Sequence, residues 1–388
     1  MLELNLLIYW MLKKIKLFIF TVARSDHGIL TNLINQLSSD KRFKVYLIKG
    51  PAHDSKLFGM TKKEIKKNKK IDILNYSFKY GKSDELSILS YMNNLIKYNS
   101  KFIKKIKPDG ALILGDRYEM FANAITCFNL KIPIFHFCGG SKTAGSLDDV
   151  YRNCISLMSD VHLVETFDHK KNLEKLGIKK NLYVVGSPSL ENIKSQTAKF
   201  SNVIKDFNLN INNKKKIILC TFHPETTSTL NQNLKYLSVL LNFLLSINQN
   251  IILTYPNADQ GFQNYINIIK NKTKDVKNFF KIKNLGKKNY FSFLKNSDLM
   301  IGNSSSGIIE SASFKLPTIN VGIRQKYRFR NKNVIDSKFS QKELKKAYKK
   351  ATSPNFNSSL QKLKNIYEKE NTSYNSIKII HNILKTKV

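Results

Sequence analysis

The segment Gly302–Glu310 carries the strongest local signal for chemistry. Its sequence, G-N-S-S-S-G-I-I-E, places three serines between an apolar run and a helix-like stretch. Backbone amides at such a turn bind phosphate oxygens, serine hydroxyls add donors, and Gly307 lets a ligand approach the backbone closely. Glu310, one turn further along, could accept hydrogen bonds from ribose hydroxyls. The alternative is a helix that is merely capped by a serine.

Other candidates follow other apolar runs along the chain. Asp116 and Arg117 form a charged pair, for which the alternative is an aspartate that favours a helix N-terminus. His223 stands between a predicted strand and a proline, where it could contact a diphosphate. His136 lies inside an apolar run, so it could equally be a core residue. His53 lies in a loop flanked by proline and glycine, where facing solvent is the alternative.

Two adjacent carboxylates, Asp148 and Asp149, precede Arg152 on a probable helix start. They could supply an acid or a base, or could form a capping cluster with an i, i+3 ion pair. The chain shows no metal-ligand spacing, no G-x-S-x-G motif and no P-loop ending. We therefore expect neither a metal nor a cofactor.

The elements that must position these residues are short apolar runs that alternate with helix-like segments. Apolar runs of four to eight residues in this alternation indicate parallel sheets covered on both faces, hence an α/β fold with doubly wound domains. The predicted strands are Lys16–Ala23, Phe43–Ile48, Ala111–Leu114, Ile132–Phe137, Leu182–Val185, Lys216–Thr221, Asn250–Tyr255, Asp298–Ile301 and Pro317–Val321.

The 388 residues are too many for one core and suit two domains. A Gly-Ser-Pro break at 186–188 predicts the boundary. We expect an N-terminal extension over 1–10, a Rossmann-like domain over 11–188, a second over 189–365 and a C-terminal helix over 366–388. Because ligands bind beyond the carboxyl ends of parallel strands, we expect the polar turns of both domains to line a cleft.

The net charge of +37 comes from 65 lysines and arginines against 28 acidic residues. Lysine, asparagine and isoleucine are all abundant, which is typical of AT-rich coding, and aromatic-interleaved basic motifs for nucleic acid are missing. We expect neither a nucleic acid nor a membrane as partner. Four cysteines without a C-x-x-C pair favour a cytoplasmic location. Arginine should persist mainly where its planar fork is needed; the arginines are Arg24, Arg42, Arg117, Arg152, Arg324, Arg328 and Arg330.

Seven motifs in chain order resemble the hydrolysing UDP-N-acetylglucosamine 2-epimerases of sialic and nonulosonic acid synthesis. They read A-R-S-D-H-G-I-L, L-G-D-R-Y-E-M-F-A, H-F-C-G-G-S-K-T-A-G, T-F-H-P, Y-P-N-A-D-Q-G, I-G-N-S-S-S-G-I-I-E and P-T-I-N-V-G-I-R-Q. The resemblance implies two Rossmann-like domains of the glycosyltransferase-B type. It also implies release of a nucleoside diphosphate from a UDP- or GDP-sugar through a glycal, with inversion at C2. A homo-oligomer, dimer or tetramer, is compatible with it.

The resemblance also implies roles for individual residues. Asp116 and Arg117 fall on the acid–base motif and Asp148 on a second carboxylate region, and His136 completes the predicted catalytic set. Predicted nucleotide- or substrate-binding residues are Arg24, His53, His223, Asn257, Ser304, Ser305, Ser306, Glu310 and Arg324.

The motif that begins at His136 departs from the family pattern H-x-E/H-G-G-E. Cys138 replaces an ionisable residue and Ser141 replaces a glutamate. Serine cannot act as a base unaided. Either Asp116 and Asp148 suffice, or the substrate differs, or turnover is impaired. The alternatives to the epimerase are therefore a glycosyltransferase of the same fold and an impaired nucleotide-sugar-binding relative.

Overall fold

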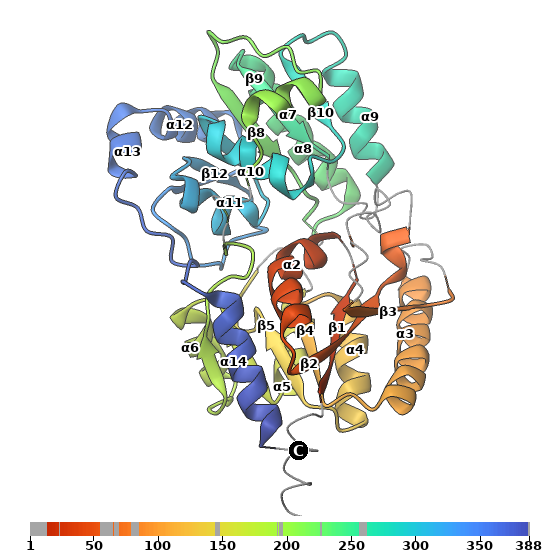
Figure 1. Ribbon diagram of the computed structural model, residues 1–388. Coiled ribbons are helices and arrows are strands. Elements are labelled where there is room, and N and C mark those ends of the chain that lie inside the picture. Colours follow the sequence, from red (N-terminus) through yellow and green to blue (C-terminus); the bar gives the residue numbers. More distant parts are fainter. Residues whose placement is uncertain are drawn as a thin grey trace, which may run out of the picture. The chain divides into compact units, whose positions relative to one another are not determined.

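Parallel strands covered by helices form both halves of the chain, as the computed structural model shows (Figure 1). The structure describes residues 14–22, 24–54, 65, 70–78, 85–143, 148–191, 193, 197–225, 227–255 and 262–386. The chain divides into two compact units. The first comprises Met1–Ser141, Val150–Glu191 and Lys369–Val388, and the second comprises Lys142–Asp149 and Asn192–Glu368.

The first unit is built on a seven-stranded sheet with the order β3-β2-β1-β4-β5-β6-β7. Every strand pair in it is parallel. Its strands are β1 (Ile15–Thr21), β2 (Phe43–Lys49), β3 (Ile71–Asn75), β4 (Gly110–Leu114), β5 (Ile134–Phe137), β6 (Val161–Val164) and β7 (Leu182–Val184). Its helices are α2 (Arg24–Ser39), the 3-10 helix η1 (Pro51–Asp54), α3 (Glu85–Ile106), α4 (Tyr118–Asn129), α5 (Asp148–Leu157), α6 (Phe167–Lys175) and α14 (Thr372–Lys385).

The second unit repeats this plan with a six-stranded parallel sheet of order β10-β9-β8-β11-β12-β13. Its strands are β8 (Ile217–Thr221), β9 (Asn250–Thr254), β10 (Phe279–Ile282), β11 (Leu299–Gly302), β12 (Thr318–Val321) and β13 (Val334–Ser337). Its helices are α7 (Phe200–Asp206), α8 (Leu230–Ser246), α9 (Phe262–Lys272), α10 (Gly286–Asn296), α11 (Ser306–Ile309), η3 (Ser311–Phe314), α12 (Gln341–Ala351) and α13 (Pro354–Ser359).

All nine predicted strands are present, and their ends differ from the prediction by one or two residues. The doubly wound α/β prediction is confirmed. Four strands were missed: β3, β6, β10 and β13. Three of them are edge strands, which are buried less completely, so their apolar patterns are weaker. The fourth, β6, carries His162 in the middle of its four residues. The predicted extension over 1–10 lies outside the described residues.

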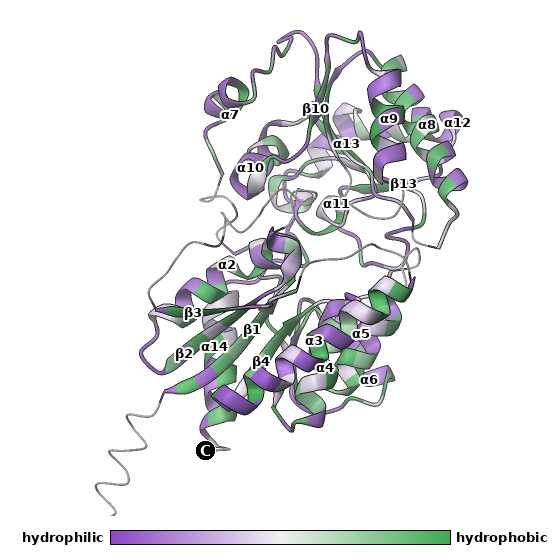
Figure 2. Cartoon of the chain, turned by 90° about the vertical axis from the view of Figure 1, so that its right-hand side faces the viewer, coloured by the Kyte–Doolittle hydropathy of each residue, from purple (hydrophilic) through white to green (hydrophobic). Residues whose placement is uncertain are grey.

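Each sheet is apolar because it is covered on both faces. β1 and β4 are coloured mainly as hydrophobic in Figure 2, and all five residues of β4 are buried. Within the described residues, no helix has the length and apolar character needed to cross a bilayer.

The C-terminal helix α14 belongs to the core of the first unit. Ile377, Ile380 and Leu384 pack in the same cluster as residues of β1 and β2. The Thr372 hydroxyl donates to the Val185 carbonyl at 2.8 Å. A Cβ added at Gly110 of β4 would lie 3.0 Å from a methyl carbon of Leu384, so the glycine allows the helix to pack closely against the sheet.

Candidate functional site

Each sheet has one place where the strand order reverses, and polar turns gather there. In the first sheet the reversal lies between β1 and β4, and in the second between β8 and β11. The connections that follow the two strands at such a point run in opposite directions along the sheet, so the turns beyond their carboxyl ends leave an opening in which ligands bind. The candidate ligand-binding turns therefore follow β4 and β5 in the first sheet. In the second sheet they follow β8, β11 and β12.

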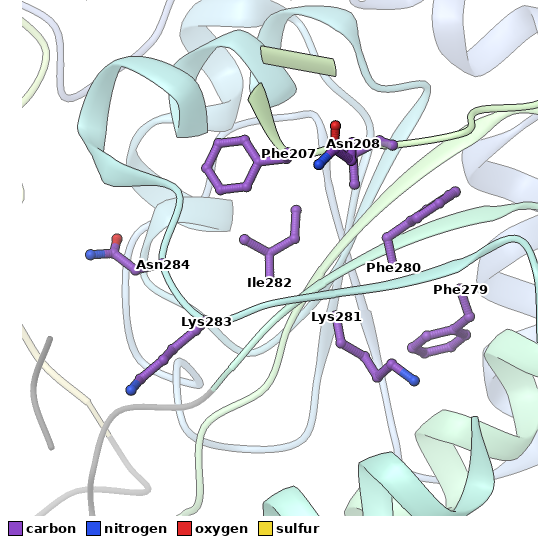
Figure 3. A pocket seen from close by; sticks show the side chains of 9 residues that line it. Phe207, Asn208, Phe279, Phe280, Lys281, Ile282, Lys283 and Asn284 are labelled. Carbon is purple, nitrogen blue, oxygen red and sulfur yellow. The ribbon is translucent and has the colours of Figure 1, made fainter. Parts of the chain in front are cut away.

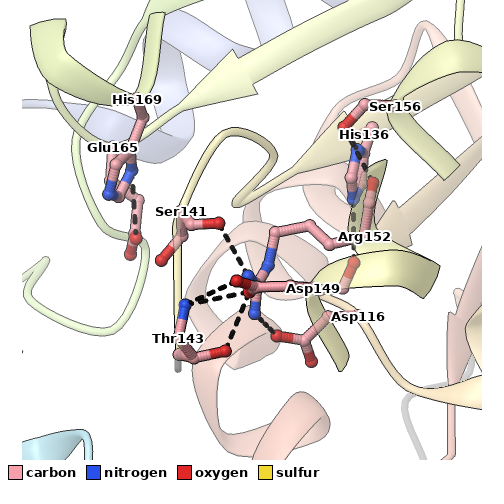
Figure 4. Close-up of polar contacts among 10 residues, drawn as sticks. Asp116, His136, Ser141, Thr143, Asp149, Arg152, Ser156, Glu165 and His169 are labelled. Atoms are coloured by element: carbon pink, nitrogen blue, oxygen red, sulfur yellow. Dashed lines mark hydrogen bonds and ion pairs between the residues drawn. The ribbon is translucent and has the colours of Figure 1, made fainter. Parts of the chain in front are cut away.

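A buried guanidinium links the turns after β4 and β5. Arg152 of α5 is only 1% exposed. One of its terminal nitrogens donates to the Ser141 carbonyl at 2.7 Å and the other pairs with the Asp116 carboxylate (Figure 4). The Asp116 side chain itself is 22% exposed. Arg152 thus fixes a carboxylate that still reaches the surface, and the pairing joins Asp116 to the loop that holds Ser141.

His136 of β5 lies entirely inside the first unit. Its Nε2 lies 2.9 Å from the Gly115 carbonyl and its Nδ1 lies 3.1 Å from the Ser156 hydroxyl. Burial lowers the pKa of His136 to about 3, so the ring is neutral. A carbonyl can only accept, so the Nε2 that faces Gly115 carries the ring hydrogen. His136 therefore positions the Gly115–Asp116 turn. Its predicted catalytic role stays a prediction.

Arg117, next to Asp116, holds its own carboxylate. Its Nε and one terminal nitrogen donate to the two oxygens of Glu119 at 3.0 and 2.9 Å. The charge of Glu119, which is buried, raises the pKa of Arg117. The guanidinium remains one-third exposed. It can present positive charge beside Asp116 while Glu119 keeps it in place.

The two neighbouring aspartates of α5, Asp148 and Asp149, differ in their contacts and exposure. Both oxygens of Asp149 accept from the Thr143 amide at 2.9 Å, and one accepts from the Thr143 hydroxyl at 2.8 Å. Asp149 thus fastens the chain before α5. Asp148 is partly exposed in the first turn, and its role as the second carboxylate stays a prediction. Arg152, for which an i, i+3 pair was one alternative, forms the ion pair with Asp116.

The loop after β5 depends on backbone that side chains disfavour. Cys138 has φ 65° and Gly140 has φ 75°. A Cβ added at Gly140 would lie 2.1 Å from the His169 carbonyl oxygen, so only glycine fits there. Asn172 donates to the Gly140 carbonyl at 2.8 Å. The loop is therefore held against α6, and Ser141 follows it with 3% of its surface exposed.

In the second unit, Asn303 joins the turns after β8 and β11. Its side chain accepts from the His223 amide at 2.7 Å and donates to the His223 carbonyl at 2.8 Å. Gly302 before it has φ 140°, and a Cβ there would lie 2.0 Å from the Thr221 carbonyl oxygen. His223, predicted to contact the nucleotide, therefore lies at the reversal of the second sheet.

Glu225 organises the turn after β12 and was not predicted. One of its oxygens accepts from the amides of Ile323 and Arg324 at 2.7 and 3.1 Å. Arg324 donates in turn to the Asn303 carbonyl at 3.3 Å. The signal was available in T-F-H-P-E, where an acidic residue follows the strand end. Its partners lie about a hundred residues away, however, and no local pattern indicates them.

The serines after Asn303 form a single helical turn. The Ser304 hydroxyl accepts from the Ser306 amide at 3.3 Å. Ser305 is the N-cap of α11, but its side chain makes no capping hydrogen bond. The simple capping interpretation thus fails for Ser305. Glu310 is the C-cap of α11, one helical turn after the serines.

Three other predicted residues lie apart from these contacts or outside the described part. His53 in η1 is buried, with Nε2 3.0 Å from the Thr21 hydroxyl, so the solvent-facing alternative is wrong. Burial lowers the pKa of His53 to about 4. Asn257 and the side chain of Arg24 lie outside the described residues. A cavity of about 460 Å³ along β10, lined by Phe207, Ile282 and neighbours (Figure 3), contains none of the predicted site residues.

Arg152 should contribute to stability because its loss leaves Asp116 and the Ser141 carbonyl without their partner. We expect Arg152→Met to lower the free energy of unfolding by about 3–5 kcal/mol, measured by urea denaturation. The control is Arg42→Met, since Arg42 pairs with Asp40 at the surface with 49% of its side chain exposed and should lose less than about 1 kcal/mol. Equal losses would contradict the linking role of Arg152.

Burial of His136 should make stability fall in acid. The unfolded histidine takes up a proton near its ordinary pKa of 6.5, whereas the folded one stays neutral down to about 3. The unfolded state therefore binds more protons in this window, and stability is lost as the pH falls through it. The difference in unfolding free energy between the native protein and His136→Asn should shrink by about 2 kcal/mol from pH 7.5 to 5. A constant difference would contradict this.

Comparisons with known proteins find relatives along most of the chain. Residues 35–381 match the family model described as UDP-N-acetylglucosamine 2-epimerase. The chain is 38% identical to the GDP/UDP-N,N'-diacetylbacillosamine 2-epimerase (hydrolyzing) of Campylobacter jejuni, with 89% of each chain covered. It is 31% identical to the UDP-N,N'-diacetylbacillosamine 2-epimerase (hydrolyzing) of Legionella pneumophila, with 83% of this chain and 84% of the relative covered. It is 30% identical to the polysialic acid biosynthesis protein P7 of Escherichia coli, with 96% and 95% covered.

Solved structures share the fold. The UDP-GlcNAc 2-epimerase of Neisseria meningitidis, solved bound to UDP-GlcNAc, superposes with a TM-score of 0.80 at 17% identity, over 95% of this chain and 100% of that one. The enzyme of Methanocaldococcus jannaschii, solved with UDP-GlcNAc and UDP, gives 0.73 at 19% identity over the same shares. These likenesses support two Rossmann-like units of the glycosyltransferase-B type. With the family model spanning most of its length, the chain belongs to the UDP-N-acetylglucosamine 2-epimerase family.

Proposed function

We propose that this chain is a hydrolysing nucleotide-sugar 2-epimerase. It takes a UDP- or GDP-linked 2-acetamido sugar and water, and it releases the nucleoside diphosphate and the C2-inverted free sugar. The observation that carries the proposal is the Asp116 carboxylate, fixed at the strand-order reversal by buried Arg152 and still partly exposed. Relatives named as hydrolysing 2-epimerases cover most of the chain.

The proposed chemistry needs a base and an acid around C2. A base removes the C2 proton, the C1–oxygen bond to the diphosphate breaks with its electron pair leaving on the diphosphate, and a glycal remains. Water then adds at C1, and a proton returns to C2 from the opposite face. Asp116 and Asp148 are the carboxylates proposed for these transfers, which are each worth roughly 10²–10⁴ in rate. Arg117, held by Glu119, would balance negative charge nearby.

The nucleotide is assigned to the second unit. The turn Asn303–Ser305 and the side chain of Arg324 lie together there, since Arg324 donates to the Asn303 carbonyl. The Ser305 hydroxyl makes no capping hydrogen bond to α11. This supports a role in which it donates to an oxygen of a bound diphosphate. A diphosphate would take hydrogen bonds from the serines and a charge-assisted bond from Arg324. His223 and Glu310 belong to the same proposed site.

The sugar is the finer part of the proposal. The relatives at 38% and 31% identity are named for N,N'-diacetylbacillosamine, a sugar with acetamido groups at C2 and C4. Ser141 is smaller than the glutamate of the family motif, so we expect the sugar site to accept a larger ring substituent. We therefore place the diacetamido sugar first and UDP-N-acetylglucosamine second. The same serine favours a second candidate, a binding protein that retains the nucleotide site without turnover.

Turnover in D₂O decides between enzyme and binding protein. With a panel of UDP- and GDP-linked diacetylbacillosamine and N-acetylglucosamine, NMR should detect a free C2-inverted sugar with deuterium at C2. Asp116→Asn should lower kcat by about 10²–10⁴ because it removes a proton acceptor. Asp206→Asn, at an exposed carboxylate of α7, should leave kcat unchanged. Nucleotide binding without product from any sugar would favour the binding protein.

Nucleotide binding can be measured separately by calorimetry with UDP and GDP. Ser305→Ala and Arg324→Ala should each weaken binding by about 1.5–3 kcal/mol, because each removes a bond to a charged diphosphate. Lys332→Ala is the control, since Lys332 is an exposed cation of the same unit. Affinities that stay at the native value in both variants would move the nucleotide away from this turn.

A further inference from the structure

An acid and a base lie buried together behind the loop after β5, and neither has a role in the chemistry above. Glu165 directly follows β6 and His169 lies in the first turn of α6. Glu165 is 2% exposed and His169 is fully buried. A carboxylate oxygen of Glu165 lies 3.7 Å from Nδ1 of His169. Burying a carboxylate is costly unless a partner compensates it, so this position needs an explanation.

The pair lies against the loop that carries Ser141. A Cβ added at Gly140 would lie 2.1 Å from the His169 carbonyl oxygen and 3.1 Å from its Cα, so Gly140 packs directly against the His169 backbone. Asn172, also on α6, holds the Gly140 carbonyl. The amide of Cys138 donates to the Leu163 carbonyl at 3.3 Å. Strands β5 and β6 therefore deliver the loop and Glu165 to the same edge of the first sheet.

The backbone carbonyl and the side-chain hydroxyl of Ser141 differ in their hydrogen bonding. Its carbonyl accepts from Arg152. Its hydroxyl is buried and has no hydrogen-bond partner among the described residues. In Figure 4 this hydroxyl points away from Arg152, toward the side on which Glu165 and His169 lie. A buried hydroxyl without a partner is destabilising, so a ligand that engages it regains that free energy.

We propose that Glu165, held by His169, is a positioning residue that acts through Ser141. On substrate binding the Ser141 hydroxyl donates its hydrogen to the Glu165 carboxylate. Its oxygen then accepts from the amide N–H of an acetamido group on the sugar. The negative charge that the loop lacks at Ser141 is thus supplied from Glu165, between β6 and α6. This inference rests on the proposed function, since it names the substrate group that Ser141 recognises.

A charge exchange between the two positions tests the proposal. Glu165→Gln keeps the shape and removes the charge, and Ser141→Glu places a carboxylate on the loop. Each single variant should lower kcat/KM about tenfold or more, the first by losing the acceptor of the serine hydrogen and the second by setting two carboxylates together. The double variant, with one carboxylate again, should recover to within about threefold of the native protein. Glu174→Gln, at an exposed carboxylate of α6, is the matched control.

The kinetic constants show how Glu165 acts. Recognition of an acetamido group that is present throughout the reaction should raise KM in Glu165→Gln and leave kcat nearly unchanged. Additive losses in the double variant, or a Glu165→Gln enzyme that matches Glu174→Gln, would overturn the proposal. So would a loss confined to kcat.

The failure of this inference is distinguishable from failure of the proposed function. If the native protein converts a sugar of the panel and the exchange shows no recovery, only the inference fails. If no sugar is converted, the function fails and the acetamido role fails with it. The unfolding free energies then still test the contact, because Ser141→Glu should destabilise the native background more than the Glu165→Gln background. Equal destabilisation would remove the contact as well.

Discussion

The first unit depends on a cation that has been taken out of water. Arg152 joins α5 to the turn after β4 through Asp116, and to the loop after β5 through the Ser141 carbonyl. Removing a guanidinium from water costs several kcal/mol, which only well-placed partners offset. The folded positions of α5, the turn after β4 and the loop after β5 therefore depend on one another. His136 adds a neutral brace between Gly115 and Ser156, so the turn that presents Asp116 is held from two sides.

In the second unit, the described turns after β8, β11 and β12 are joined by backbone groups and by the side chains of Asn303 and Glu225. Asn303 pairs with the His223 backbone, and the Glu225 carboxylate collects amides from the turn after β12. Backbone amides and carbonyls do here what a guanidinium does in the first unit. Arg324, which follows β12, is only partly buried. The described turns of the first unit thus carry a fixed carboxylate, and those of the second unit carry backbone amides, serine hydroxyls and the Arg324 side chain.

Local sequence patterns were sufficient for the inner strands and for the turns beyond them. Short apolar runs such as Gly110–Leu114 are buried throughout, and polar residues follow them at the carboxyl edge. The scarcity of arginine was informative as well, because Arg42, Arg117, Arg152 and Arg330 each make several directed hydrogen bonds.

Contacts between distant segments could not be predicted in this way. Arg152 could be paired on its own helix by spacing alone, yet its partner Asp116 lies 36 residues away. Glu225 likewise serves amides 98 and 99 residues further on. Glu165 gave no signal because its surroundings come from the loop after β5 and from α6. These pairings arise from the sheet order, which brings turns together that the sequence keeps apart.

The packing of α14 in the first core has a consequence for synthesis on the ribosome. Residues 192–368 form most of the second unit, and Ile377, Ile380 and Leu384 come after them. The apolar core of the first unit therefore cannot be completed until residues 192–368 have been translated. During that interval β1, β2 and α2 lack their cover, and their apolar surface is open to chaperones or to other nascent chains. The second unit, continuous over this stretch, can fold earlier although it is made later.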